Sequence, residues 1–277
     1  MSKSSTSSNP SEVLASLKKL GQNRLLAHLD TTSAENRSEL LKQLSSLDFE
    51  AISKLLQAPK TADLATQVNL EPVESVEESS ELASAKAEAA IQAGHLAAFT
   101  VAGGQGSRLG YEGPKGQFGC TPIRKAPLFA VFAEKIIATQ HRYGVTIPWV
   151  LMTSPQNNAP TQAFFRQNKF FGLREEQLFF FPQGMLPAID AQTGDFLLES
   201  PSSLALSPDG HGGSIKGLYR SGALAWLKSR GVKTLSYFQV DNPLVNIIDP
   251  RFIGEHILFE SQFSSKTLPK RAANEKV

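Results

Sequence analysis

The 277-residue sequence holds a single cysteine, Cys120, and carries a formal net charge of only +2. One cysteine excludes an intrachain disulfide and the paired-cysteine patterns of zinc and redox sites. A small charge that is spread along the chain does not favour a nucleic-acid surface. We therefore expect no nucleic-acid partner, and we interpret Cys120 as a packing residue.

Long hydrophobic runs are also missing. No apolar stretch approaches the roughly 20 residues that a membrane-spanning helix needs. The first residues, MSKSSTSSNPSEV, lack the apolar core of a secretory signal. We expect a cytoplasmic protein without a membrane partner. Hydrophobic residues make up 41% of the sequence, which is typical of a globular chain that can bury a core.

The sequence divides into three parts. Residues 1–57 combine a Ser-rich tail with apolar residues at helical spacing, and Thr32 with Glu35 has the form of a capping box. Residues 58–94 carry prolines and an acidic, Ser-rich stretch before an Ala-rich helix. Residues 95–277 alternate short apolar runs with amphipathic stretches. We predict a helical appendage, a connecting segment and a catalytic domain, in that order.

The alternation within 95–277 is typical of an α/β fold, with a parallel sheet and helices on both of its faces. The apolar runs predict strands at 95–101, 148–153, 178–181 and 235–240. The amphipathic stretches predict helices at 125–143, 161–170, 216–230 and 250–261.

A glycine-rich loop, AGGQGSRLG, follows the first expected strand at 102–110. Glycines let main-chain N–H groups approach an anion closely, and the loop should lie at the carboxyl edge of the sheet, where α/β folds bind ligands. Leu109 stands where a dinucleotide-binding GxGxxG would need glycine, and neither Gly103 nor Gly110 starts a Walker A motif. A nicotinamide-dependent dehydrogenase is therefore a weak alternative. A tight turn alone would not require four glycines and an arginine.

Charged residues accompany this loop. Arg108 and Lys115 could neutralise a triphosphate and a departing pyrophosphate, although taken alone they could be two solvated cations. Asp241 ends the apolar run 235–240. Its carboxylate could bind Mg²⁺ there, or it could cap a turn before Pro243.

These segments resemble a known family. GGQGSRLG followed by the string GPKG at 113–116 is similar to the signature of the eukaryotic-type UDP-sugar pyrophosphorylases, in particular those that act on N-acetylglucosamine. Further matching segments follow in the family's order, namely Met152–Ser154, Phe170–Leu173, Pro182–Pro187, Val240–Leu244 and Asp249–Gly254. The resemblance implies a Rossmann-like (GT-A-like) nucleotidyltransferase with a mixed sheet flanked by helices, preceded by the helical appendage.

The resemblance also implies roles for single residues. The residues expected to hold the uracil and ribose are Ala102, Gly103, Gly104, Gln183 and Gly210. Those expected at the phosphates are Arg108 and Lys115, with Asp241 as the Mg²⁺ ligand. Those expected at the sugar are His211 and Asn242.

The activity implied is that of a UTP:sugar-1-phosphate uridylyltransferase, which forms a UDP-sugar and pyrophosphate. The expected sugar substrate is N-acetylglucosamine 1-phosphate. His211 departs from the asparagine of such enzymes and matches the histidine of UDP-glucose enzymes, so a UDP-glucose or broad UDP-sugar pyrophosphorylase is the alternative. Because the chain stops before the family's C-terminal part, a truncated, non-catalytic uridine-nucleotide-binding module is an alternative of another class.

Overall fold

The computed structural model describes residues 9–57, 80–268 and 272, so most of the expected connecting segment lies outside the described residues. The chain forms two compact units. The first combines the N-terminal helices with 184–209, and the second contains 80–183 and 210–268. Within the described residues, no helix has the length and apolar character needed to cross a membrane.

Four helices make up most of the first unit. They are α1 (Pro10–Lys19), α2 (Asn23–Thr31), α3 (Ala34–Ser45) and α4 (Phe49–Gln57). The helical character of this region is confirmed, but the expected cap at Thr32 is wrong by one residue. Thr32 ends α2 in an extended conformation, and Ser33 caps α3 by accepting a hydrogen bond from the backbone N–H of Asn36.

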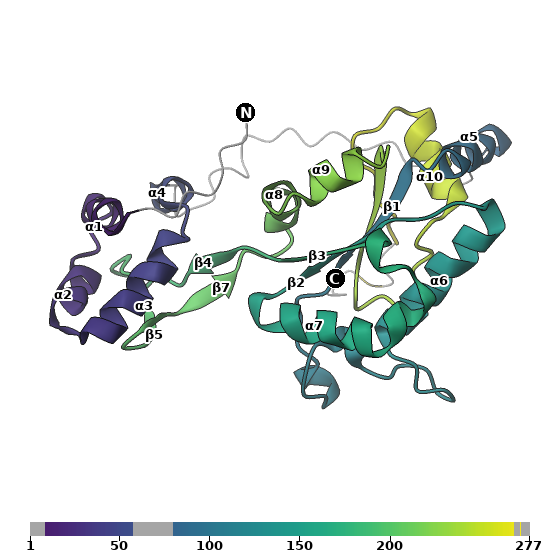
Figure 1. The fold of residues 1–277 in the computed structure, drawn as a ribbon. Coiled ribbons are helices and arrows are strands. Elements are labelled where there is room, and N and C mark those ends of the chain that lie inside the picture. The colour runs from purple at the N-terminus through teal and green to yellow at the C-terminus, as the bar shows by residue number, and fades with distance from the viewer. Residues whose placement is uncertain (1–8, 58–79, 269–271, 273–277) are drawn as a thin grey trace. The chain divides into compact units, whose positions relative to one another are not determined.

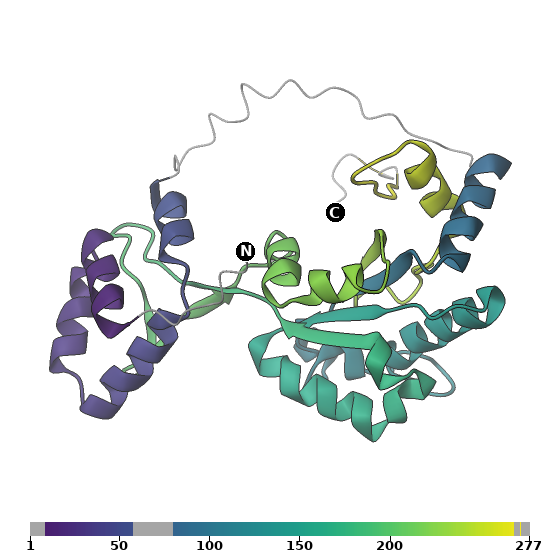
Figure 2. The same cartoon turned by 45° about the horizontal axis from the view of Figure 1, so that its top comes forward.

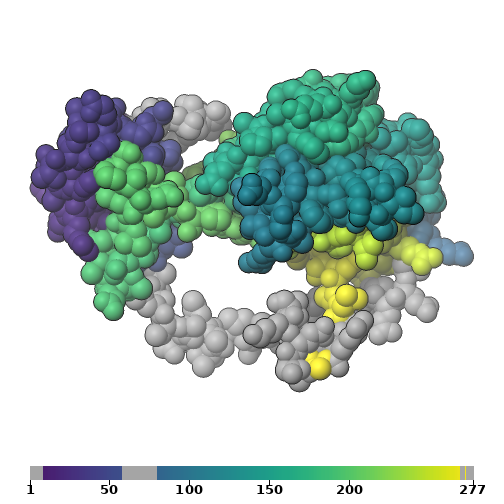
Figure 3. Space-filling view, turned by 90° about the horizontal axis from the view of Figure 1, so that it is seen from below, coloured from purple at the N-terminus to yellow at the C-terminus, as the bar shows by residue number. Residues whose placement is uncertain are grey.

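The segment 184–209 forms two small antiparallel strand pairs. These are β4 (Met185–Pro187) with β7 (Leu206–Pro208), and β5 (Leu198–Ser200) with β6 (Ser203–Leu204). The sequence pattern places this segment in the domain 95–277, whereas the structure groups it with the N-terminal helices. The reason is a shared core, since Phe196 and Leu204 are buried among the leucines of the helices. In Figure 3 the green residues of this segment lie directly against the purple helices.

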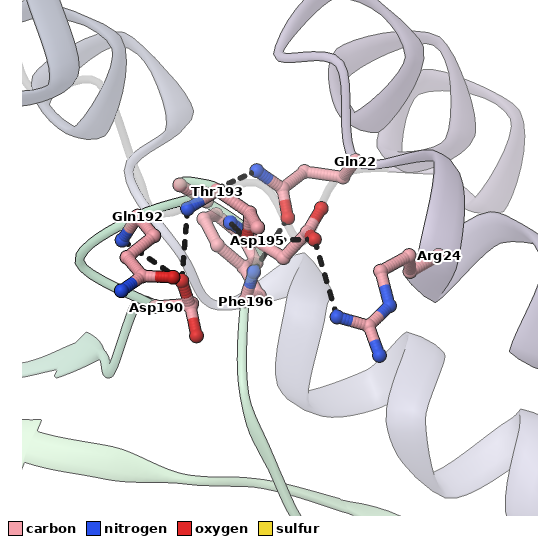
Figure 4. A network of polar contacts seen from close by, with 8 residues as sticks. Gln22, Arg24, Asp190, Gln192, Thr193, Asp195 and Phe196 are labelled. Carbon is pink, nitrogen blue, oxygen red and sulfur yellow. Dashed lines mark hydrogen bonds and ion pairs between the residues drawn. The ribbon is translucent and has the colours of Figure 1, made fainter.

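Polar side chains hold the same segment to the helices. Gln22, only 3% exposed, donates through Nε2 to the carbonyl oxygen of Gly194 at 3.0 Å and accepts through Oε1 from the N–H of Phe196 at 2.6 Å (Figure 4). Arg24 lies 3.6 Å from the Asp195 carboxylate. The two hydrogen bonds of Gln22 thus give partners to backbone groups that are not paired within a strand, as the burial of a loop requires.

The second unit is built on a four-stranded sheet whose described strands are all parallel. Its strands lie in the order β3 (Leu178–Pro182), β2 (Trp149–Thr153), β1 (Leu96–Val101), β8 (Thr234–Gln239). All four expected strands are confirmed to within one residue at each end. The antiparallel strand pairs among the described residues lie in the first unit, and the second unit adds only isolated antiparallel bridges.

Helices cover both faces of this sheet, as expected (Figures 1 and 2). On one face Leu96 and Ala98 share a core with α5 (Glu81–Gln92), α6 (Leu128–Tyr143), α7 (Pro155–Gln167) and α10 (Pro250–Leu258). On the other, Ala97 and Phe99 pack against α8 (Gly213–Arg220) and α9 (Ala223–Lys228). Consecutive residues of β1 thus serve opposite cores, which explains why the strand is a continuous apolar run.

The expected helices are confirmed, but their bounds differ. α6 begins three residues after the expected start at 125, and α10 ends three residues before the expected end at 261. The other two expected helices differ more. The expected helix 216–230 is divided into α8 and α9 because Gly222 adopts a φ of 84°, a left-handed conformation that interrupts a helix. α7 begins well before residue 161 and runs through Pro160. Its start is set by Ser154, which accepts from the N–H of Asn157, and by Pro155 at the first helical position, where a missing N–H costs little.

Candidate functional site

The candidate site lies at the carboxyl edge of the sheet. The expected residues at 102–115 follow β1, Gln183 follows β3, and Asp241 and Asn242 follow β8. The strand order places β2 on one side of β1 and β8 on the other, so the connections diverge at β1. A crevice at such a divergence point is where open α/β sheets bind their ligands.

The glycine loop folds back on itself directly after β1. Ala102 is buried and donates its N–H to the carbonyl oxygen of Met152 at 2.7 Å, so it still belongs to the sheet. The N–H of Lys115 donates to the carbonyl oxygen of Gly104 at 3.0 Å, and that of Gly106 to the carbonyl oxygen of Gly113 at 2.8 Å. These bonds close the loop and bring Lys115 back to its glycine-rich start.

Asn157, a residue that sequence reasoning missed, fastens this loop to α7. It is 2% exposed, and its Nδ2 donates to the carbonyl oxygens of Gly103 at 2.9 Å and Gly104 at 3.2 Å. Its Oδ1 accepts from Gln105 Nε2 at 2.8 Å. One amide therefore fixes three successive residues of the loop. The only signal in the sequence was its position in the first turn after β2, at the same edge of the sheet.

Gln183 lies against the start of the loop. Its N–H donates to the carbonyl oxygen of Thr153 at 2.7 Å, continuing the β2–β3 ladder. A Cβ placed on Gly103 would lie only 3.0 Å from Gln183 Nε2, so the side-chain amide rests over this glycine. Two of the expected nucleotide-binding residues, 80 positions apart, are thus in contact. Glycine at 103 is what leaves room for the amide.

Lys115 and Asp241 form an ion pair, with 2.9 Å between Nζ and Oδ2. The lysine side chain is 17% exposed and the aspartate side chain 53% exposed. The backbone of Lys115 is held by its neighbour Gly116, which packs so closely on Phe129 of α6 that a Cβ there would lie 2.1 Å from the ring. The structure therefore brings together the expected phosphate-binding cation and the expected metal-binding carboxylate.

The donor set at Asp241 can be compared with what Mg²⁺ requires. Among the described residues, no group of three or more His, Cys, Asp and Glu side chains could hold a metal ion. Mg²⁺ commonly uses one or two carboxylates together with water and substrate phosphates. A single half-exposed carboxylate at the carboxyl edge of the sheet fits that mode of binding, and it does not fit an all-protein metal cage.

The loop that follows Asp241 is anchored from α6. Lys135 donates through Nζ to the carbonyl oxygens of Pro243 at 2.6 Å and Val245 at 2.8 Å. Burial lowers the pKa of Lys135 below its usual range. Within this loop the exposed Asn242 donates its N–H to the carbonyl oxygen of Gln239 at 3.2 Å. The contacts explain how an irregular segment keeps Asp241 and Asn242 in place.

Gly210 and His211 form the turn that leads into α8. Gly210 has a φ of 65°, a conformation that favours glycine, and its carbonyl oxygen accepts from the N–H of Gly213. His211 is exposed, and its Nδ1 lies 2.5 Å from the hydroxyl of Tyr237 on β8. Sequence reasoning did not single out Tyr237, because it looks like any aromatic residue of a strand.

Arg108 stands apart from these contacts. It lies on the exposed single turn Ser107–Leu109, and among the described residues it has no hydrogen-bond or ion-pair partner. The structure therefore brings Lys115 to the aspartate and leaves Arg108 at the tip of the loop.

Comparison with known proteins agrees with the sequence resemblance. The profile of the UTP–glucose-1-phosphate uridylyltransferase family matches residues 48–277. UDP-N-acetylglucosamine diphosphorylase 2 of Arabidopsis thaliana is 34% identical over 292 residues, covering 98% of this chain and 58% of the relative. UDP-N-acetylglucosamine pyrophosphorylase of Saccharomyces cerevisiae is 35% identical over 277 residues, covering 93% and 58%.

A solved structure extends the likeness to three dimensions. The uridine diphosphate N-acetylglucosamine pyrophosphorylase from Trypanosoma brucei, solved in complex with an inhibitor, superimposes with a TM-score of 0.80 at 29% identity. The match covers 98% of this chain and 59% of that one. The chain thus spans less than two thirds of the length of these relatives.

Proposed function

The chain belongs to the UTP–glucose-1-phosphate uridylyltransferase family, and we propose that it transfers the uridylyl group of UTP to a sugar 1-phosphate. The main support for the proposal is the ion pair between Lys115 and Asp241 at the carboxyl edge of the sheet, beside the glycine-rich loop. A cation and a carboxylate at that edge serve phosphoryl chemistry through charge neutralisation and metal binding.

The nucleotide would lie on the glycine loop. The backbone of Ala102, Gly103 and Gly104 holds the uracil and ribose in this proposal. Gln183, whose amide rests over Gly103, supplies a donor and an acceptor together, which matches the edge of uracil. Because glycine has no Cβ, the backbone of Gly210 can approach the uracil closely in this proposal.

The reaction we propose is an in-line displacement at the α-phosphorus of UTP. An oxygen of the sugar 1-phosphate forms the new P–O bond, while the bond to the β-phosphate oxygen breaks and pyrophosphate leaves with the electron pair. The nucleophile is already ionised, so no general base is needed and catalysis rests on positioning and charge. Lys115 neutralises charge that develops on the phosphates, and Arg108 is available to the leaving pyrophosphate.

We propose Mg²⁺ as the cofactor, held by Asp241. When bound, it would supply positive charge to the phosphate oxygens of both substrates. The Lys115 ammonium donates a hydrogen bond to this carboxylate, so the aspartate also has a cationic side chain as partner.

N-acetylglucosamine 1-phosphate is the sugar substrate we propose, since the relatives that cover most of this chain are named for UDP-N-acetylglucosamine. A second candidate is glucose 1-phosphate. It is favoured by His211, an exposed imidazole in the turn before α8, because the resemblance assigns histidine at this position to UDP-glucose enzymes.

Pyrophosphate release from UTP, measured with Mg²⁺ over a panel of sugar 1-phosphates, tests the proposal. Turnover with N-acetylglucosamine 1-phosphate or glucose 1-phosphate is expected. Asp241→Asn, which keeps the size of the side chain and removes its charge, should lower turnover by at least about 100-fold, the scale of losing one electrostatic contact in a transition state. Asp30→Asn, at an exposed position of α2, is the matched control and should leave the rate unchanged.

Calorimetric titration with UTP and with UDP-sugars separates catalysis from binding. Binding without turnover for any sugar would support a uridine-nucleotide-binding module instead of an enzyme. A chain that binds neither UTP nor a UDP-sugar would overturn both functions.

A further inference from the structure

His211 and Tyr237 form a side-chain pair across two elements of the second unit. The His211 Nδ1 and the Tyr237 hydroxyl are 2.5 Å apart, and the two rings meet edge to face at 74° with their centroids 6.2 Å apart. Neither residue needs the other for burial, because both side chains remain partly exposed. The contact orders two exposed side chains, at a cost in conformational entropy, without adding to the core.

Tyr237 is the fixed member of the pair. It lies on β8 opposite Phe99 of β1, and its ring packs edge to face on Phe99 with 5.3 Å between centroids. The ring is therefore held against the sheet, and its hydroxyl makes the contact with His211. Burial raises the pKa of the Tyr237 phenol, so the hydroxyl keeps its proton at neutral pH.

The backbone of His211 is fixed as well. Its carbonyl oxygen accepts from Ser214 Oγ at 2.7 Å and from the N–H of Ser214 at 3.1 Å, at the first turn of α8. With the backbone held by α8 and Nδ1 held by β8, the imidazole has one preferred orientation. Its second nitrogen, Nε2, is left for a ligand.

We propose that Tyr237 is the positioning residue for sugar recognition, holding the His211 imidazole so that Nε2 meets the sugar of the sugar 1-phosphate. This inference rests on the proposed function and deepens it. The phenol donates to Nδ1, so the proton of the neutral imidazole is on Nε2, which then donates to a sugar oxygen. The same strand β8 leads into Asp241, so one rigid element supplies both the orientation of the sugar contact and the metal ligand.

A hydroxyl deletion on Tyr237 tests the inference. Tyr237→Phe should raise KM for the sugar 1-phosphate by about 5- to 30-fold, the range expected for losing one oriented hydrogen bond, and leave KM for UTP within twofold. Tyr219→Phe removes a hydroxyl from an exposed tyrosine of α8 and is the matched control. Equal rises in both KM values with a lower Tm would show a merely structural tyrosine and overturn the inference.

A double-mutant cycle separates orientation from independent binding. If Tyr237 acts through His211, then His211→Ala and the double variant His211→Ala/Tyr237→Phe should have the same KM for the sugar 1-phosphate. Additive effects would mean that Tyr237 contacts the sugar, or the fold, on its own, and would contradict the positioning role.

Two further measurements do not depend on turnover. Nitrogen-15 NMR of the imidazoles, with His211 assigned from its loss in His211→Gln, should show a single Nε2–H tautomer that becomes a mixture in Tyr237→Phe. Calorimetry should show weaker UDP-sugar binding and unchanged UTP binding in that variant.

The outcomes distinguish failure of the proposed function from failure of the positioning role. A wild-type chain with the single tautomer but neither turnover nor UDP-sugar binding would refute the proposed function, and with it the role of the pair in binding the sugar. Normal turnover with unchanged sugar affinity in Tyr237→Phe would refute the positioning role alone.

Discussion

Lys115 Nζ lies 2.9 Å from Asp241 Oδ2, and this ion pair joins two segments that are 126 positions apart in the sequence. The aspartate is half exposed, so the pair contributes little to stability, about 0–1 kcal/mol. Its significance is in where it holds charge, at the edge of the sheet where the glycine loop returns to β1.

Replacing Lys115 by methionine keeps the length of the side chain and removes its charge. We expect turnover to fall by at least about 100-fold, because a preorganised cation at the phosphates is lost. The free energy of unfolding should change by less than about 1 kcal/mol. Pyrophosphate release and thermal unfolding measure the two effects, with Lys228→Met at an exposed site of α9 as control. Normal kinetics would show that Lys115 only neutralises Asp241.

Asn157→Leu removes the amide that ties Gly103, Gly104 and Gln105 to α7 while keeping a similar volume. The variant should lose about 1 kcal/mol of stability, since the hydrogen bonds from the amide to the partly buried Gly103 and the exposed Gly104 are lost. It should also bind UTP at least tenfold more weakly, because the loop is no longer held. Denaturant unfolding and UTP calorimetry check this. Weaker binding without any loss of stability would mean that Asn157 contacts the nucleotide instead of fastening the loop.

Gly116→Ala introduces a Cβ that would lie 2.1 Å from the Phe129 ring. The aromatic core must shift to accept it, which overpacking data put at about 1–3 kcal/mol or more. Gly212→Ala is the matched control, because a Cβ there meets nothing within 4 Å and the backbone has no positive φ. Thermal unfolding should separate the two variants by several degrees. Similar Tm values would show that η3 (Lys115–Gln117) moves away from Phe129 easily.

Gln22→Leu tests whether hydrogen bonds from the N-terminal helices stabilise the packing of 184–209 against them. The N–H of Phe196 and the carbonyl oxygen of Gly194 lose their partner, at a cost of about 1–3 kcal/mol. Limited proteolysis should then cut within 188–204, whereas we expect the wild-type chain to resist cleavage there. Gln167→Leu, at the exposed last residue of α7, is the control. An unchanged cleavage pattern would mean that the apolar core alone secures this segment.

His256 predicts a pH dependence of stability. Burial lowers its pKa below the usual 6.5, and Nδ1 is 2.9 Å from Ser264 Oγ. Well above pH 6.5 the imidazole is neutral in both the folded and the unfolded state, so it has no effect on stability. As the pH falls below 6.5 the unfolded chain takes up the proton first, and folding stability decreases until the folded-state pKa is passed. Between pH 7.5 and 5, Tm of the wild type should therefore fall more than Tm of His256→Asn. Parallel curves for the two proteins would contradict the assignment.

The sheet could be predicted from the sequence because its two central strands, β1 and β2, are buried on both faces. In a globular chain, an apolar run of five or six residues between amphipathic helices is most often a strand of a covered parallel sheet. Helix bounds were less predictable, since they depend on single residues. Gly222 divides one expected helix, and Ser33 takes the capping role that Thr32 and Glu35 suggested one residue earlier.

The site residues that belong to a local sequence motif could be predicted. The glycine loop, Lys115 and Asp241 belong to recognisable strings, and the structure brings the last two into contact. Asn157 and Tyr237 have no such string, because their partners lie on distant segments. For the same reason, the sequence did not predict that 184–209 belongs to the first unit. The residues around Phe196 and Leu204 do not indicate which core buries these two side chains.

The shared core of 9–57 and 184–209 has a consequence for how the chain is made. Synthesis proceeds at about 5–20 residues per second, so the N-terminal helices leave the ribosome on the order of ten seconds before the segment that completes their core. During that interval the leucines that later surround Phe196 and Leu204 lack their cover. Chaperone demand in the cell should therefore be greatest before residue 204 emerges, and a ribosome stalled between 57 and 184 should hold the first unit in its most aggregation-prone form.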